Sequence, residues 1–143
     1  MESPEEGKTG CFIIMDIDRF KEINDRFGHP EGDRILKGVA ENLKRVFGNK
    51  GILGRLGGDE FVALINYQMS REEIEEQLRR LREEIGQIHI QEEHVTCSVG
   101  VLPVVREYNI DKLYHRADRL LYEAKKQGRD QFVFGKRDVE QEG

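Results

Sequence analysis

The stretch Arg55-Leu56-Gly57-Gly58-Asp59-Glu60-Phe61 places a double glycine directly before two carboxylates. Apolar residues typical of strands lie on both sides of it, at 51–54 and 61–65. Two strands joined by a Gly-Gly corner predict a β-hairpin with Asp59 and Glu60 at its tip. Glycine allows a positive φ and a close approach of a ligand, so the tip suits a divalent cation held against phosphate. A solvated polar turn is the alternative interpretation.

The composition describes one globular domain with a heavily charged surface, since 37% of the 143 residues are hydrophobic and 36% are charged. The net charge of −5 argues against a general nucleic-acid binder, which usually carries a basic excess. No apolar run approaches the roughly 18 residues of a membrane span, and the polar, acidic start does not resemble a signal peptide. We therefore expect a cytoplasmic domain without nucleic-acid or membrane contacts, with Cys11 and Cys97 as buried thiols.

Hydrophobic patterning predicts the order β-α-α-β-β-α-β-α-β. The expected strands lie at 11–15, 51–54, 61–65, 95–101 and 131–134. The expected helices lie at 20–27, at 35–47 after a break over 28–33, at 71–88 behind a Ser70/Glu73 capping box, and at 113–124. Helices interleaved with strands around one hairpin predict an α/β (α+β) fold, a mixed central sheet of about five strands flanked by helices. The folded domain is expected over 10–135, with flexible ends at 1–9 and 136–143.

Asp16 directly follows the first apolar run, so it is expected at the C-terminal end of a buried strand. If the hairpin pairs beside this strand, Asp59 and Glu60 share a cleft with Asp16. Like charges packed closely repel, and divalent cations would relieve the repulsion. Asp18 is expected to cap the helix that begins near Arg19, with metal ligation as the alternative.

These motifs together resemble the GGDEF-domain diguanylate cyclase family. The Gly-Gly-Asp-Glu-Phe motif is complete at 57–61, and the likeness spans residues 11 to 134 in order and spacing. The other matching stretches are Asp16-Ile17-Asp18-Arg19-Phe20-Lys21, Asn24-Asp25, Gly28-His29-Pro30-Glu31-Gly32-Asp33, Ser98-Val99-Gly100-Val101, Ala117-Asp118 and Leu121-Tyr122-Glu123-Ala124-Lys125-Lys126-Gln127-Gly128-Arg129.

The resemblance implies an enzyme that joins two GTP molecules into cyclic di-GMP and releases two pyrophosphates. Each domain of such a homodimer holds one GTP, and each 3′-hydroxyl attacks the α-phosphate of the other. The implied fold is a palm-like sheet related to nucleotide cyclases and polymerases. An upstream sensor domain usually drives the dimerisation, and none is present in this chain.

The resemblance also implies site residues. Asp16, the Ile17 carbonyl and Asp59 would bind Mg²⁺, with Mn²⁺ as the alternative ion, and Asp59 or Glu60 would deprotonate the 3′-hydroxyl. Asn24 and Asp33 would read the guanine edge. The remaining substrate positions are implied at Phe20, Lys21, His29, Leu36, Gly57 and Gly58.

Lys125 and Arg129 lie four residues apart and are expected to share a helix face, where the resemblance assigns them to the GTP phosphates. His29 is expected in a loop, and Phe20 and Leu36 suit core packing as well as guanine binding. Asp130 departs from the family, which mostly has asparagine there, and is expected to weaken the phosphate contacts modestly.

A further departure concerns the inhibitory Arg-x-x-Asp product site of many family members. Its window here reads Gly48-Asn49-Lys50-Gly51, so no product inhibition through that site is expected. Two alternatives to an active cyclase stay open. One is a catalytically weak GTP-binding module that regulates a larger signalling protein, and the other is a structural or dimerisation domain.

Overall fold

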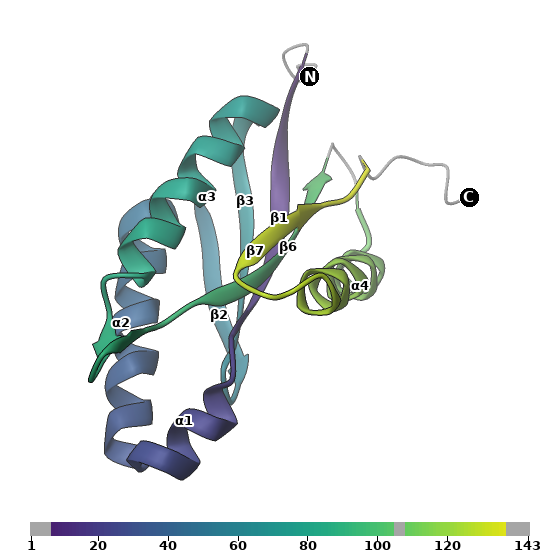
Figure 1. Ribbon diagram of the computed structural model, residues 1–143. Helices are drawn as coiled ribbons and strands as arrows, with labels where there is room; N and C mark the ends of the chain where they lie inside the picture. Colours follow the sequence, from purple (N-terminus) through teal and green to yellow (C-terminus); the bar gives the residue numbers. More distant parts are fainter. Residues whose placement is uncertain (1–6, 105–107, 137–143) are drawn as a thin grey trace.

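The computed structural model describes residues 7–104 and 108–136 (Figure 1). Its elements run in the order β1 (Lys8–Ile17), α1 (Phe20–Phe27), α2 (His29–Phe47), β2 (Gly51–Gly57), β3 (Glu60–Ser70), α3 (Arg71–Ile85), β4 (His89–Ile90), β5 (Glu93–His94), β6 (Cys97–Val104), α4 (Ile110–Lys126) and β7 (Gln131–Phe134). This order confirms the mixed fold expected from the sequence, with one small hairpin added.

The main sheet has five strands in the order β2-β3-β1-β6-β7. The apolar strand β1 lies in the centre, antiparallel to both β3 and β6, whereas the edge strand β7 runs parallel to β6. Burial of β1 on both faces explains why residues 11–15 of this strand are continuously apolar rather than alternating. The predicted hairpin is present, because β2 and β3 pair antiparallel through their glycine corner.

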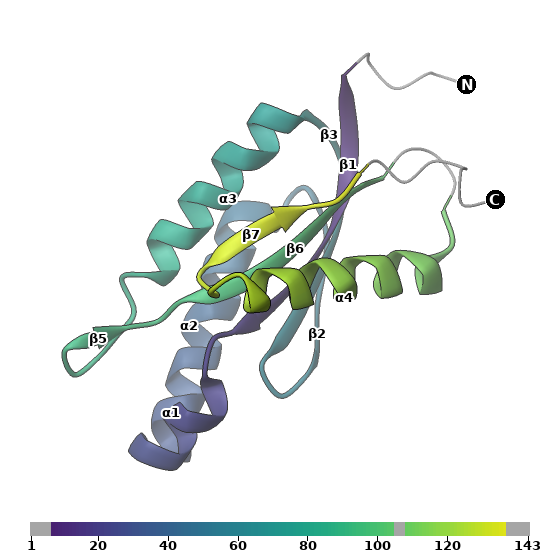
Figure 2. The same cartoon turned by 45° about the vertical axis from the view of Figure 1, so that its right-hand side comes forward.

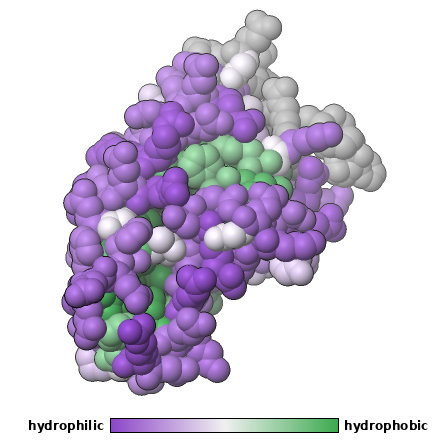
Figure 3. Space-filling model, viewed as in Figure 1, coloured by the Kyte–Doolittle hydropathy of each residue, from purple (hydrophilic) through white to green (hydrophobic). Residues whose placement is uncertain are grey.

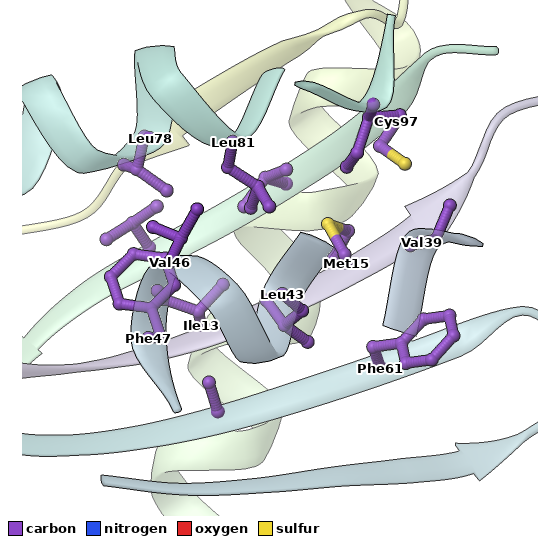
Figure 4. Close-up of a cluster of buried hydrophobic side chains, with 14 of the residues drawn as sticks. Ile13, Met15, Val39, Leu43, Val46, Phe47, Phe61, Leu78, Leu81 and Cys97 are labelled. Atoms are coloured by element: carbon purple, nitrogen blue, oxygen red, sulfur yellow. The ribbon is translucent and has the colours of Figure 1, made fainter. Parts of the chain in front are cut away.

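Helices cover both faces of the sheet. Figure 2 shows α4 on one side and α2 and α3 on the other, and the two buried clusters among the described residues follow this division. Alternate residues of β1 serve the two sides, since Ile13 and Met15 pack towards α2 and α3 (Figure 4), whereas Phe12 and Ile14 pack towards α4. Cys11 and Cys97 are buried free thiols, as expected, and burial raises the pKa of Cys11 to about 12.

Ser70 caps α3 as predicted. Its hydroxyl accepts from the Glu73 N–H at 3.0 Å, and the Glu73 carboxylate accepts from the Ser70 N–H at 2.9 Å. The capped helix buries a stripe of Ile74, Leu78, Leu81 and Ile85, but it ends at Ile85, so the expected extension to Ile88 is wrong. The cap therefore fixes where β3 ends and α3 turns back over the sheet.

The structure corrects several of the predicted boundaries and adds one element. The break expected over 28–33 shrinks to Gly28, because α2 begins at His29 and Pro30 stands in its first turn, where proline is tolerated. Lys8 and Thr9, assigned to the flexible start, belong to β1 and pair with β3. The β4–β5 hairpin was not predicted, since strands of two residues carry no periodicity. The rest of the expected flexible ends, residues 1–6 and 137–143, lies outside the described residues.

Among the described residues, no helix is both long enough and apolar enough to cross a membrane.

Candidate active site

The glycine corner between β2 and β3 depends on left-handed backbone. Gly57 has a φ of 133° and Gly58 a φ of 53°, values that side chains disfavour. The Arg55 guanidinium fixes the corner by donating from Nε to the Gly58 carbonyl at 2.9 Å. The chain can therefore reverse tightly and present Asp59 and Glu60 directly after the turn.

Pairing of β1 with β3 brings the acidic residues together. Asp16 lies opposite Glu60 in the register, and the Ile17 N–H donates to the Asp59 carbonyl at 3.3 Å. Opposed residues on neighbouring strands project from the same face of a sheet, here the face covered by α4. Asp16, Asp59 and Glu60 thus meet at one end of the central strand, as the sequence predicted.

The Asp16 carboxylate is only half satisfied. Its Oδ2 forms an ion pair with the Lys125 ammonium from α4, whereas its buried Oδ1 has no hydrogen-bond partner among the described residues. A buried carboxylate oxygen without a donor is costly, and such an exception needs an explanation. A cation at Oδ1 would supply the missing interaction.

The pKa values of the neighbouring Asp59 and Glu60 carboxyl groups are shifted by burial and by the nearby charges. Burial, followed by the charge of Asp16, raises the pKa of Asp59 and also that of Glu60. The Tyr114 hydroxyl donates to Glu60 Oε1 at 3.4 Å, which opposes part of the increase in the pKa of Glu60. Burial and the Glu60 charge in turn raise the pKa of Tyr114. These shifts report a cluster that carries excess negative charge.

The donor set fits a hard divalent cation, because every candidate ligand is an oxygen. Within residues 7–104 and 108–136, no group of three or more Asp, Glu, His or Cys side chains is placed to hold a metal ion. Magnesium commonly takes one or two carboxylates and completes its shell with phosphate and water. Asp16 and Asp59, with the Ile17 carbonyl, could supply the protein's share of such a shell.

The residues expected near guanine lie on α1 and α2. The side chain of Asn24 lies against Gly32, where a Cβ would come within 1.8 Å of the Asn24 Oδ1. A larger residue at 32 would therefore displace the Asn24 side chain from its present position. Asp33 follows on the exposed surface of α2, and Phe20 and Leu36 are partly buried against the core. Figure 3 shows apolar surface in the region of α1 and α2.

Lys21 is exposed on α1, as a group reaching towards solvent or ligand would be. His29 is also exposed, but it begins α2 instead of lying in the expected loop. As the first residue of α2, His29 follows directly after Gly28, which joins α1 to α2.

Arg129 does not share a helix face with Lys125, so that prediction is wrong. The helix α4 ends at Lys126, and Arg129 adopts a left-handed φ of 64° while its N–H donates to the Ala124 carbonyl at 2.9 Å. Gly128 ends the helical path before the fourth residue is reached. Lys125 contacts Asp16 from the helix, whereas Arg129 lies exposed in the corner that leads to β7.

The capping role expected for Asp18 is also wrong. Arg19 occupies the N-cap position of α1 without any side-chain cap, and Asp18 is buried with only 6% exposure. Its carboxylate accepts hydrogen bonds from Thr96, Ser98 and the Asp130 N–H. Asp130 meanwhile pairs with Arg82 of α3, so its charge is partly neutralised rather than aimed freely at a phosphate.

The sequence analysis did not identify Tyr114, Arg82 and Thr96. A signal for Tyr114 exists, because Tyr114, Asp118 and Lys125 share one face of α4 at helical spacing and meet the carboxylates together. Arg82 and Thr96 gave no such signal, since only the folded chain places them beside the turn after α4.

Residues 48–51, which align with the inhibitory product motif, pack tightly against neighbouring backbone. A Cβ on Gly48 would lie 2.3 Å from the Lys44 carbonyl oxygen, and one on Gly51 would lie 2.1 Å from that of Leu64. The two positions where the motif needs arginine and aspartate therefore have no room for side chains in this backbone.

The sheet order and the acidic cluster at the end of its central strand define a palm-type α+β domain. The sequence profile described as "Diguanylate cyclase, GGDEF domain" matches residues 1–131, so the chain belongs to the GGDEF domain family. Expected recognition and fold are thereby confirmed.

Relatives agree with this assignment. The chain is 35% identical over 130 residues to the probable diguanylate cyclase DgcT of Escherichia coli K12, covering 86% of this chain and 28% of that protein. It is 38% identical over 129 residues to the diguanylate cyclase DgcP of Pseudomonas aeruginosa, covering 87% and 19%. The solved active GGEEF domain of a diguanylate cyclase from Vibrio cholerae superimposes with a TM-score of 0.78 at 30% identity, covering 92% of this chain and 85% of that one. The chain thus spans less than a third of the length of these two sequence relatives.

Proposed function

We propose that this domain is a diguanylate cyclase that condenses two GTP into cyclic di-GMP and two pyrophosphates. The observation that carries the proposal is the unpartnered Oδ1 of Asp16 beside Asp59, Glu60 and the Lys125 ammonium. This arrangement pairs oxygen ligands for a cation with a positive group for phosphate, and family membership supplies the reaction class.

Asp16, Asp59 and the Ile17 carbonyl would hold a divalent cation, Mg²⁺ or, in the same oxygen site, Mn²⁺. When bound, the cation would lower the pKa of an attacking hydroxyl and neutralise charge on the phosphates. Lys125 and Arg129 bind and orient the triphosphate. Gly57 and Gly58 leave the backbone at the corner open for the nucleotide, since no atom lies within 4 Å of a Cβ built on either.

Asp59 or Glu60 accepts the proton of the 3′-hydroxyl. Both carboxyl groups suit this role, because burial and the Asp16 charge raise the pKa of each above its ordinary value and so make it a stronger base. Only one bond forms at each α-phosphate, from the 3′-oxygen, while the bond to the pyrophosphate oxygen breaks. The hydroxyl proton goes to the carboxylate.

Guanine is recognised between α1 and α2. The Asp33 carboxylate accepts from N1–H and the exocyclic amine together, a donor pair that adenine lacks, and the Asn24 amide completes the edge. Phe20 and Leu36 pack against the base, with Lys21 and His29 at the rim. Apolar surface in the region of the two helices supports this placement (Figure 3).

Each domain holds one GTP, so catalysis needs two copies that meet with their sites facing. The matched relatives are longer than this chain, which supports a further domain that senses a signal and controls the pairing. GTP is a cytoplasmic substrate, and we place the reaction there.

The test is incubation of the protein at high concentration with GTP and Mg²⁺, followed by mass spectrometry for cyclic di-GMP. We expect product from the wild type, none from Asp59→Ala, and wild-type levels from Glu76→Ala, an exposed carboxylate on α3. GTP binding without product would support the regulatory module instead. Neither binding nor product would support a structural domain. Product from Asp59→Ala would overturn the metal assignment.

A further inference from the structure

Asp18 is the most completely satisfied carboxylate near the site. Its Oδ1 accepts from the Ser98 hydroxyl at 2.6 Å, and its Oδ2 accepts from the Thr96 hydroxyl at 2.6 Å and from the Asp130 N–H at 3.0 Å. Ser98 is fully buried in β6. With both oxygens occupied by donors, Asp18 serves neither as the helix cap nor as a ligand with a free lone pair directed at the metal position.

The Asp130 end of this network lies in a strained corner. Arg129 and Asp130 have φ values of 64° and 52°, and two consecutive non-glycine residues in this region persist only where surrounding structure holds them. The corner joins α4 to β7, beside the start of β6 (Figure 2), where Ser98 pairs with Gln131.

A second attachment reaches the corner from α3. The Arg82 guanidinium binds the Asp130 carboxylate through Nε at 3.0 Å and Nη2 at 3.1 Å, and this pairing raises the pKa of Arg82. Both side chains are partly exposed, at 54% and 37%, so solvent screens the pair and its contribution is small. The buried Asp18 carboxylate therefore carries most of the restraint, because charge-assisted hydrogen bonds strengthen away from water.

We propose that Asp18, assisted by Arg82, is a positioning residue that holds the 128–130 corner and so presents Arg129 to the triphosphate. The inference rests on the proposed function for the role of Arg129. One continuous segment carries both phosphate-binding groups, with Lys125 anchored on Asp16 and Arg129 anchored through its neighbour on Asp18. Asp16 and Asp18, at the C-terminal end of β1, thereby set the distance between the Lys125 ammonium and the Arg129 guanidinium. Asp16 does so by direct contact with Lys125, and Asp18 does so through the Asp130 N–H.

Asp18→Asn is the informative variant. An asparagine side chain keeps the shape, and its single carbonyl oxygen can still accept from Thr96 and the Asp130 N–H if the Ser98 hydroxyl turns to accept from the amide, but the negative charge that strengthens these hydrogen bonds is lost. We expect the KM for GTP to rise about tenfold, with a smaller change in kcat. Thr96→Val removes one donor to the same carboxylate and should give a weaker effect in the same direction. Asp130→Asn, which keeps the N–H but weakens the Arg82 pair, should change KM less than twofold.

A double-mutant cycle with Arg129→Ala separates positioning from general damage. If Asp18 acts through Arg129, Asp18→Asn costs kcat/KM in the wild type and adds nothing further in the Arg129→Ala background. Equal losses in both backgrounds would overturn the proposal. Asp111→Asn, an exposed aspartate in the first turn of α4, is the matched control and should behave as the wild type.

Amide hydrogen exchange tests the same inference without turnover. We expect the Asp130 N–H to be protected in the wild type and to exchange at least tenfold faster in Asp18→Ala, which removes the acceptor, with unchanged circular dichroism. Unchanged protection would overturn the clamp whatever the activity. If the wild type forms no product, the proposed function fails, and the cycle is then measured as affinity for a non-hydrolysable GTP analogue. Absence of analogue binding would overturn the phosphate role of Arg129, whereas the exchange result would still decide whether Asp18 holds the corner.

Discussion

Lys125 and Asp16 form an ion pair across 109 residues of sequence, joining the last helix to the end of the central strand. The Lys125 ammonium occupies one oxygen of a carboxylate whose other oxygen has no partner among the described residues. The single Lys125 ammonium stands against the three carboxyl groups of Asp16, Asp59 and Glu60, so the site retains net negative charge. Under the proposed function, a metal ion at Oδ1 and the Lys125 ammonium at Oδ2 would therefore compete for the charge of the same carboxylate.

This competition predicts an unusual pair of effects for Lys125→Met. Without nucleotide, the variant should bind Mn²⁺ several-fold more tightly than the wild type, because a nearby positive charge is removed. With GTP, turnover should fall by about tenfold or more, since the phosphates lose a cation. Calorimetric titration and initial rates measure the two effects. Lys126→Met, exposed in the same helical turn, is the control, and unchanged metal affinity in Lys125→Met would contradict the competition.

The raised pKa values of Asp59 and Glu60 predict a pH-dependent cost to stability in the absence of metal. A carboxyl whose pKa is higher in the folded state contributes stability at low pH and loses it as the pH rises through the folded pKa. Asp59→Asn should therefore raise the melting temperature in EDTA at pH 7 but not at pH 4. The informative quantity is the difference between variant and wild type, because Arg34 and Ser70 lower the pKa values of Glu31 and Glu73 and so give the opposite trend. An equal melting temperature at pH 7 would contradict the repulsion.

Asp33→Ala should erode the preference for GTP over ATP. In the proposed site the Asp33 carboxylate accepts from the N1–H and the exocyclic amine of guanine. Its removal would therefore cost charge-assisted hydrogen bonds worth roughly 1.5–3 kcal/mol, which corresponds to about 10- to 100-fold in relative kcat/KM. Competition between the two nucleotides, with product masses read separately, gives the ratio. Glu41→Ala, exposed on the same helix, should leave the ratio unchanged. Unaltered selectivity in Asp33→Ala would remove Asp33 as the guanine reader.

Added cyclic di-GMP should not inhibit the enzyme through the window at 48–51. Neither the arginine nor the aspartate of the product motif is present there. Initial rates at micromolar added product should equal those without it. A clear fall in rate would show that another surface binds the product. Replacement of Asn49 by alanine is a control, since its exposed side chain should not affect the rate in either condition.

The elements that the sequence predicted are those in which local pattern and tertiary packing agree. The continuous apolar run at 11–15 became the central strand because it is buried on both faces, and the Ser70/Glu73 pair capped α3 because the capping box is local. The cluster of Asp16, Asp59 and Glu60 was also predictable, since it requires only that β1 and β3 pair at their ends.

The errors arose where a long-range contact overrode a local preference. Asp18 stands where a helix cap would be expected, yet buried donors on β6 and after α4 hold it instead. Arg129 has helical spacing from Lys125, but the left-handed corner ends the helix first. None of the three partners of Asp18 lies within 70 positions of it, and no sequence period connects them.

The tight packing of residues 48–51, between α2 and β2, bears on how the proposed reaction would be regulated by its product. Because Gly48 and Gly51 press against carbonyl oxygens, two point substitutions could not restore a feedback site without moving the sheet edge. If the domain is a cyclase, as we propose, it would not be inhibited through that surface as its product accumulates. The steady level of the messenger would then be set by GTP supply, by whatever brings two copies together, and by the enzymes that degrade the messenger.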